Sequence, residues 1–190
     1  MNRRTFIATL GASSAAYLLS PLTFAQSMKA PAINRPLEQI RADWKSFAAP
    51  NSSIVVTATP PDKRSNAEWR KVLGREPYHV LREEGTEPPG SSPYNNEKRR
   101  GIYACAGCGL ALFTSEMKFD SGTGWPSFFT SIPGHFATKR DFKLILPRTE
   151  YHCARCEGHH GHLFTDGPKP TGERWCNNGV ALRFVPTESA

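Results

Sequence analysis

The amino-acid sequence predicts a mainly β domain, and three observations support this fold class. From residue 101 onward, short apolar or alternating runs are separated by Gly, Pro and Asp, which is typical of antiparallel strands. The long 3.6-residue periodicity of amphipathic helices does not occur there. Two Cys-x-x-Cys units punctuate this region. We expect strands at 101–104, 111–114, 142–146, 149–152, 162–164 and 180–184.

The N-terminus predicts a signal peptide over residues 1–25. Arg3 and Arg4 precede a weakly apolar stretch at 6–24, and Ala25 suits cleavage before Gln26. Paired arginines before an apolar stretch that contains Gly and Ser are typical of the twin-arginine export route. We therefore expect export to the periplasm. An uncleaved leader that anchors the chain in a membrane is the alternative, because the apolar run is near the minimum length for a span.

The next segment, residues 26–61, is rich in Ala, Pro, Ser and Thr. This composition predicts a linker, with one short helix at about 37–47. The folded domain is then expected at 62–190. A chain of 190 residues leaves room for one domain of ordinary size behind the leader and is too short for two.

Two short helices are expected at the start of this domain. Ser65 and Glu68 have the spacing of a capping box, so a helix should follow and run to about Leu73. A second short helix is expected at 77–81, ending at Gly85.

The charge of the chain argues against a nucleic-acid partner. The formal net charge is +7, and loss of the two leader arginines would lower it to +5. A surplus this small, spread over a whole domain, does not predict a nucleic-acid surface. We expect a monomer.

Four of the five cysteines form two Cys-x-x-Cys pairs, Cys105 with Cys108 and Cys153 with Cys156. Two such turns can supply four thiolates in the tetrahedral arrangement of structural zinc, and a closed four-sulfur site leaves no open position for catalysis. We therefore predict one structural Zn²⁺ per chain. Two disulfides, a redox-active Cys-x-x-Cys pair and a rubredoxin-like iron site stay open as alternatives, since an exported protein permits disulfides.

Cys176 is left over once the other four cysteines bind a metal. In an exported protein such a cysteine is reactive, paired with another chain, or buried and inert. Arg174 and the nearby His159, His160 and His162 favour a reactive thiol, because positive charge or an imidazole lowers the pKa of a thiol. A core or metal-ligand role for the histidines stays open on these grounds.

Several segments resemble the methionine-R-sulfoxide reductase family, the B-type enzymes. Residues 119–128 contain Gly-Trp-Pro-Ser-Phe, residues 158–168 read Gly-His-His-Gly-His-Leu-Phe-Thr-Asp-Gly-Pro, and residues 174–178 read Arg-Trp-Cys-Asn-Asn. Residues 78–87 resemble the family's N-terminal segment. The resemblance runs from about Asn66 to Val185, and its motifs occur in the expected order.

This resemblance implies two antiparallel sheets with short N-terminal helices, structural zinc at the paired cysteines, and Cys176 as the nucleophile. The thiolate would attack the sulfoxide sulfur of an oxidised protein or peptide while an acid protonates the departing oxygen, which leaves a cysteine sulfenic acid. His162 and His159 match the family's active-site histidines, which position substrate and move that proton. The resemblance further places Trp125, Phe128 and His159 at the substrate and Asn178 in the catalytic site.

The chain departs from the family's pattern at three places. Thr123 stands where many members carry a second cysteine that resolves the sulfenic acid as a disulfide. We therefore expect no efficient intramolecular disulfide, and direct reduction by an external, thioredoxin-like thiol. Gly179 and Ala181 stand where serines are common, which removes two hydroxyls. His160 replaces an apolar residue, and the sequence offers no account of it.

Other functions are compatible with parts of the sequence. A zinc-ribbon module that binds nucleic acid or protein explains the paired cysteines but not the leader or the thiol beside histidines. A catalytically inactive, zinc-bound binding module and reduction of free methionine sulfoxide are further alternatives. In the inactive case Trp125 is an ordinary core aromatic, Asn178 a turn residue, and the thiol does not react with sulfoxide.

Overall fold

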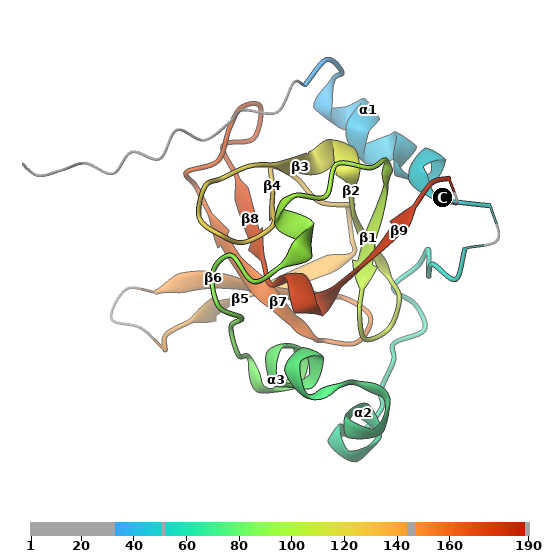
Figure 1. Ribbon diagram of the computed structural model, residues 1–190, viewed down its shortest axis with the longest axis vertical. Coiled ribbons are helices and arrows are strands. Elements are labelled where there is room, and N and C mark those ends of the chain that lie inside the picture. Colours follow the sequence, from blue (N-terminus) through green and yellow to red (C-terminus); the bar gives the residue numbers. More distant parts are fainter. Residues whose placement is uncertain (1–32, 51, 144–146, 189–190) are drawn as a thin grey trace, which may run out of the picture.

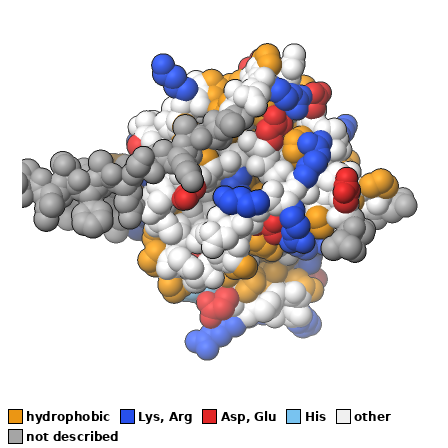
Figure 2. All heavy atoms as spheres, turned by 45° about the horizontal axis from the view of Figure 1, so that its top comes forward, with side chains coloured by type: hydrophobic (Ala, Val, Ile, Leu, Met, Phe, Trp, Pro, Cys, Tyr) orange, Lys and Arg blue, Asp and Glu red, His pale blue; other side chains and the backbone are white. Residues whose placement is uncertain are grey.

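A computed structural model describes residues 33–50, 52–143 and 147–188 (Figure 1). The predicted signal peptide lies outside these residues. Within the described part, no helix is long and apolar enough to cross a membrane. Figure 1 shows the strands in the middle of the molecule and short helices at two opposite ends. Figure 2 shows Lys and Arg side chains interspersed with Asp and Glu on one face.

The larger sheet has six antiparallel strands in the order β3-β4-β8-β7-β6-β5. Its edge strand β5 exposes Lys139 and Arg140. Charged side chains on an edge discourage pairing with a second chain. The strands are β3 (Lys118–Phe119), β4 (Ser127–Phe128), β5 (Phe136–Asp141), β6 (Arg148–Cys153), β7 (His159–Phe164) and β8 (Arg174–Asn177).

The smaller sheet has three antiparallel strands, β1 (Gly101–Cys105), β2 (Ala111–Thr114) and β9 (Leu182–Pro186), in the order β2-β1-β9. Every residue of β1 and β2 is buried, which explains their nearly continuous apolar sequences. The chain is therefore mainly β with two antiparallel sheets and a few short helices, as predicted.

Aromatic side chains fill the core between the sheets. Phe113 of β2 stacks on Phe128 of β4, with ring centroids 3.9 Å apart. Tyr103 of β1 meets the same Phe128 ring edge-on at 5.1 Å. Trp175 of β8 and Tyr151 of β6 form another edge-on pair at 4.9 Å. Large aromatic side chains dominate the burial of apolar area, so these contacts hold the two sheets together.

The two predicted helices are present. α2 (Asn66–Val72) begins at the predicted capping box: the Ser65 hydroxyl accepts from the Glu68 backbone N–H, and the Glu68 carboxylate accepts from the Ser65 backbone N–H. α3 (Arg75–Glu83) begins two residues before the predicted start at Pro77. Proline is tolerated in the first turn of a helix, because the N–H that it lacks has no helical partner there.

The segment before these helices is part of the domain. α1 (Leu37–Ala42) and the 3₁₀ helix η1 (Asp43–Phe47) occupy the predicted helical stretch. Ile40, Trp44 and Phe47 are buried and belong to the main core. Apolar side chains at a spacing of three or four residues share one helix face, which here packs against the sheets.

Beyond η1, the chain continues along the smaller sheet. The Val55 backbone N–H donates to the Gly109 carbonyl (2.8 Å), and the Ala111 N–H donates to the Val55 carbonyl (2.9 Å). The described residues from 33 to 61 therefore differ from the predicted linker. Composition indicated a polar, turn-rich segment and could not show that its few apolar side chains have a surface to cover.

Some of the predicted strands agree with the structure in their bounds, and others do not. Strands over 101–104, 111–114 and 149–152 are present with shifts of at most one residue, whereas β7 begins earlier and β9 later than expected. The strand expected at 142–146 is instead β5, which ends at Asp141, and residues 144–146 lie outside the described part. The short strand β8 was not predicted, because Arg-Trp-Cys-Asn shows no alternation of apolar and polar residues.

We expect Ile40→Ala to lower the free energy of unfolding by about 2–5 kcal/mol, because it leaves a cavity at a fully buried position. Val56→Ala, at a side chain that is 51% exposed in the same segment, is the matched control and should change stability by less than about 0.5 kcal/mol. Urea unfolding of the chain from Gln26 measures both. Equal, small effects would show that the segment is a linker after all.

Candidate active site and metal centre

The two Cys-x-x-Cys pairs come together in one buried cluster. Cys105 ends β1 in the smaller sheet, and Cys153 ends β6 in the larger sheet. All four sulfur atoms lie within 4.8 Å of one another. The Sγ–Sγ distance is 3.7 Å for Cys105 and Cys156 and 3.5 Å for Cys108 and Cys153. These distances are far longer than a disulfide bond of about 2.05 Å, so the cysteines are free thiols that could hold a metal ion.

Two arginines, one from α3 and one from within the second turn, donate hydrogen bonds to backbone carbonyls of the two cysteine turns. Arg82 of α3 donates to the Cys156 carbonyl oxygen (2.7 Å). Arg155 donates to the Cys108 carbonyl oxygen (3.1 Å). All four cysteines are buried, so charge on their sulfur atoms would be poorly screened by water. Four thiolates can therefore share this space only when a cation offsets their charge.

The fifth cysteine lies in a pocket of its own. Cys176 of β8 is paired in register with His162 of β7 on one side and Ser127 of β4 on the other. A pocket with a volume of about 120 Å³ opens above it. The pocket is lined by Thr86, Trp125, Arg148, Gly161, His162, Phe164, Cys176, Asn177 and Asn178.

Gly161 allows β7 and β8 to approach closely at the pocket. A Cβ atom at this position would lie 2.0 Å from the Cys176 carbonyl oxygen, well inside van der Waals contact. Glycine is the residue that permits such an approach of two backbones. The Gly161 position therefore fixes the distance between His162 and Cys176.

The Cys176 thiol is half-buried beside a positive charge. Burial raises the pKa of the Cys176 thiol, whereas the charge of Arg174 and hydrogen bonding with Thr123 and Arg174 act in the opposite direction. Arg174 is itself held by Asp166 through two hydrogen bonds of 2.9 and 3.0 Å. The predicted electrostatic support for the thiol thus comes from Arg174.

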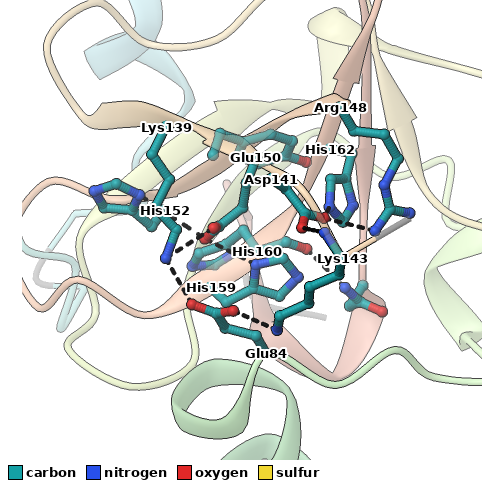
Figure 3. A network of polar contacts seen from close by, with 12 residues as sticks. Glu84, Lys139, Asp141, Lys143, Arg148, Glu150, His152, His159, His160 and His162 are labelled. Atoms are coloured by element: carbon teal, nitrogen blue, oxygen red, sulfur yellow. Dashed lines mark hydrogen bonds and ion pairs between the residues drawn. The ribbon is translucent and has the colours of Figure 1, made fainter. Parts of the chain in front are cut away.

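The histidines occupy different environments (Figure 3). His162 lines the pocket, and its Nε2 lies 2.8 Å from Asp141 Oδ2. His159 is only 3% exposed, is absent from the pocket wall, and has Nδ1 2.9 Å from Glu150 Oε1. The two rings meet edge-on with centroids 5.4 Å apart. Of the two predicted histidines, only His162 can touch a molecule in this pocket.

His160, whose role could not be predicted from the sequence, is a core residue. It is fully buried and packs edge-on against Phe136 at 5.5 Å. Burial lowers the pKa of His160 to about 3. The ring is therefore neutral at physiological pH and fills the space of the apolar residue that it replaces.

Phe128 differs in placement from the other predicted substrate residues. It is fully buried and stacked on Phe113, so it does not line the pocket. Its neighbour in β4, Ser127, takes the register position opposite Cys176. Phe128 can support the pocket only from the core beneath it.

Glu87, which the sequence analysis did not single out, joins several segments of the pocket through hydrogen bonds. Its carboxylate accepts the backbone N–H groups of Gly179 (2.5 Å) and Val180 (2.9 Å), just beyond the cysteine strand. Its backbone N–H donates to Asn178 Oδ1 (3.0 Å), and its carbonyl accepts Trp125 Nε1–H (3.1 Å). Glu87 lies in an irregular segment, and the only signal for it was its place in a family-like motif.

The glycine at position 179 is also explained by this region. A Cβ atom there would lie 1.9 Å from the Ser92 hydroxyl oxygen. Ser92 is buried and fills the space that a serine at 179 would need. Where the family resemblance leads us to expect a serine at position 179, this chain has a glycine, and the Ser92 hydroxyl takes up the space instead.

Comparison with known proteins gives a consistent family. Residues 73–186 match the SelR domain. A protein from Agrobacterium fabrum, named peptide methionine sulfoxide reductase MsrB, is 49% identical over 129 residues, covering 67% of this chain and 96% of the relative. Proteins of the same name are 49% identical in Methanosarcina barkeri, over 66% of this chain and 89% of the relative, and 50% identical in Pseudomonas putida, over 64% and 93%.

We expect Glu87→Ala to lower the free energy of unfolding by about 1–3 kcal/mol, because the Gly179 and Val180 amides lose their acceptor in a buried place. Glu87→Gln, which keeps one acceptor oxygen, should lose less. Glu76→Ala, at an exposed carboxylate, is the control and should stay within about 0.5 kcal/mol. Urea unfolding that shows no difference between positions 87 and 76 would contradict this role of Glu87.

Proposed function

Since the chain belongs to the SelR family and is a peptide methionine sulfoxide reductase, we propose that Cys176 reduces the R epimer of methionine sulfoxide in proteins and is itself oxidised to a sulfenic acid. The observation that carries this proposal is the position of the Cys176 thiol in the pocket walled by Trp125 and His162. It is the one cysteine among the described residues that reaches this pocket.

The proposed reaction is, in its net balance, an oxygen transfer from one sulfur atom to another. The Cys176 sulfur attacks the sulfoxide sulfur to form an S–S bond, and the sulfoxide S–O bond breaks as the protonated oxygen leaves as water. Water then adds to the Cys176 sulfur, the S–S bond breaks and the thioether leaves. The sulfoxide is reduced to a thioether, and the cysteine is oxidised to a sulfenic acid. One sulfoxide and one thiol thus give one methionine and one Cys-SOH. The departing oxygen must be protonated, which requires an acid within hydrogen-bond reach.

We assign the residues of the pocket to this reaction by their positions. His162 supplies or relays the proton to the oxygen, because it lines the pocket opposite Cys176. Trp125 offers an apolar wall to the S-methyl group, which selects one epimer by shape. Asn178 orients the wall through its bond to the Glu87 N–H. His159 packs edge-on against the His162 ring and supports its position without touching the substrate.

The sulfenic acid is reduced by an external thiol in this proposal. Among the described residues, the other four cysteines belong to the buried cluster, and none of them lines the pocket. Thr123, which is within hydrogen-bond reach of Cys176, stands where the family resemblance leads us to expect a resolving cysteine. A thioredoxin-like protein or a small thiol must therefore approach Cys-SOH from outside.

We expect wild-type protein with dithiothreitol to consume only the R epimer of a methionine sulfoxide peptide. Cys176→Ser should lower the rate by at least about 10³-fold, because a hydroxyl is a far weaker nucleophile than a thiolate. An epimer-resolved chromatographic assay measures this, and unchanged zinc content and melting temperature of Cys176→Ser show that the loss of activity is not a loss of fold. Turnover of both epimers, or activity in the Cys176→Ser variant, would refute the proposed reaction.

We assign zinc to the four-cysteine cluster. Zn–S bonds of about 2.3 Å in a tetrahedron place sulfur atoms about 3.8 Å apart, close to the 3.5 and 3.7 Å found here. Cys105, Cys108, Cys153 and Cys156 would hold the ion, and four thiolates leave it no free position for substrate. The ion supplies stability by joining the smaller sheet to the larger one.

We expect one zinc per chain by elemental analysis, and Cys153→Ser should lose most of it. The melting temperature should then fall by at least about 10 °C, since metal binding in such sites is folding free energy. Cys176→Ser is the matched control and should keep both zinc and stability. Stoichiometric iron in place of zinc, or an unaltered melting temperature in Cys153→Ser, would contradict this assignment.

We further propose that the enzyme is exported to the periplasm by the twin-arginine route and repairs oxidised exported proteins there. The support is the pair Arg3 and Arg4 before a weakly apolar stretch. Replacing both arginines by lysine should strongly reduce the exported fraction in cell fractionation. The same replacement at Arg35 and Arg41 is the control and should not. Unchanged export of the leader variant would exclude this route.

A further inference from the structure

We propose that Asp141 is a positioning residue that holds His162 in one orientation and one tautomer, so that His162 delivers its proton into the pocket. This inference rests on the proposed function and adds a residue to it. The carboxylate lies at the end of β5, and its Oδ2 atom is 2.8 Å from His162 Nε2 (Figure 3). Because Nε2 is hydrogen-bonded to Asp141, Nδ1 is the ring nitrogen that can give a proton to a ligand or take one from it.

Asp141 is itself fixed from three sides. Its Oδ2 also accepts a hydrogen bond from Arg148 Nη2 at 2.6 Å, and its Oδ1 accepts the Lys143 backbone N–H at 2.9 Å. The side chain is only 7% exposed. Asp141 and Arg148 are also register partners across β5 and β6. A carboxylate held in this way cannot turn away from the imidazole without breaking two other bonds.

These bonds also keep Asp141 charged. The hydrogen bond from Lys143, together with those from His162 and Arg148, holds the pKa of Asp141 well below its usual range. A carboxylate that accepts two or three hydrogen bonds in its charged form stays ionised at all physiological pH values. His162 therefore always faces an anion at Nε2.

Asp141 is the acid within hydrogen-bond distance of His162. Glu150 of β6 is the register partner of His162, but its carboxylate is engaged by His159 and Lys139. The other charged or titratable groups that face His162 are Arg148 from β6, His159 from the same strand as His162 and the Cys176 thiol from β8. Burial lowers the pKa of His162, and the hydrogen bond to Asp141 opposes that effect. Without Asp141, the imidazolium form would lose its only hydrogen-bonded anion among the described residues, in a partly buried site where burial disfavours the charged ring.

The neighbouring acid–histidine pair gives a natural comparison. His159 lies beside Glu150, which is 2% exposed and 2.9 Å from Lys139 Nζ. Figure 3 shows this second pair beside the first, with Lys139 linking Glu150 to Glu84. Because His159 does not line the pocket, its carboxylate should affect the ring behind the site far more than the proton donor.

The test compares Asp141→Asn with Glu150→Gln in the zinc-loaded chain from Gln26. NMR titration of the histidine rings reports the pKa of His162 directly, and the pH profile of kcat/KM reports the acid used in turnover. Removing the anion disfavours imidazolium, so in Asp141→Asn the pKa of His162 should fall by about 1 unit or more. The alkaline limb of the profile should move down by the same amount.

The two variants should differ in their effect on the rate. At pH 8, Asp141→Asn should lower kcat/KM by about tenfold to 100-fold, which is at or below the lower end of what general acid catalysis contributes, because the acid itself is retained. It should have almost no further effect in a His162→Asn background, since the two residues act together. Glu150→Gln should move the titration of His159 and change the His162 titration and the alkaline limb far less than Asp141→Asn does, because Glu150, although the register partner of His162, is paired with His159 and Lys139.

An unchanged His162 titration in Asp141→Asn, or a shift of the alkaline limb in Glu150→Gln instead, would overturn the inference. The NMR arm needs no substrate, so it decides the Asp141–His162 pairing even if wild-type protein reduces no sulfoxide. That last result would count against the proposed function alone. Well-dispersed spectra and full zinc content in Asp141→Asn show that the variant is folded.

Discussion

The close pairing of β7 with β8 is the constraint on which the rest of the site depends. Gly161 lets the two backbones approach, and this sets His162 opposite Cys176. Other strands of the larger sheet then add the remaining groups: β5 places Asp141 at the imidazole, and β4 places Ser127 beside the cysteine. The four-cysteine cluster ties the ends of β1 and β6 together, so both sheets are fixed around this pair.

The electrostatics of the site follow from burial. A half-buried thiol resists ionisation, and Arg174 is the cation placed to counter this. Burial also lowers the pKa of His162, and the hydrogen bond to the Asp141 carboxylate opposes this shift. The Cys176 thiol and the His162 imidazole are thus each paired with one fixed opposite charge, and each of those charges is held by further hydrogen bonds. Preorganised charges of this kind act without rearrangement during a reaction.

The sequence predicted those features that local chemistry determines. The capping box at Ser65 and the cluster of four paired cysteines are both present as expected. Each can be recognised from residue types only three positions apart in the sequence. The strand that carries Cys176 was missed, since its four residues show no periodicity and its pairing depends on distant partners. The burial of Trp44 and the two bonds of the Glu87 carboxylate likewise join segments far apart in the chain. The sequence pattern also could not show that His159 lies behind His162.

Single-turnover analysis of the Cys176 oxidation state tests the central claim most directly. Wild-type protein is mixed with a substoichiometric R-sulfoxide peptide without reductant, quenched with dimedone, and analysed by mass spectrometry of its cysteine peptides. The account predicts one dimedone adduct on Cys176 for each methionine formed, with no disulfide within the chain. Methionine formation with an unmodified Cys176, or with the oxidation trapped at the four-cysteine cluster, would contradict it.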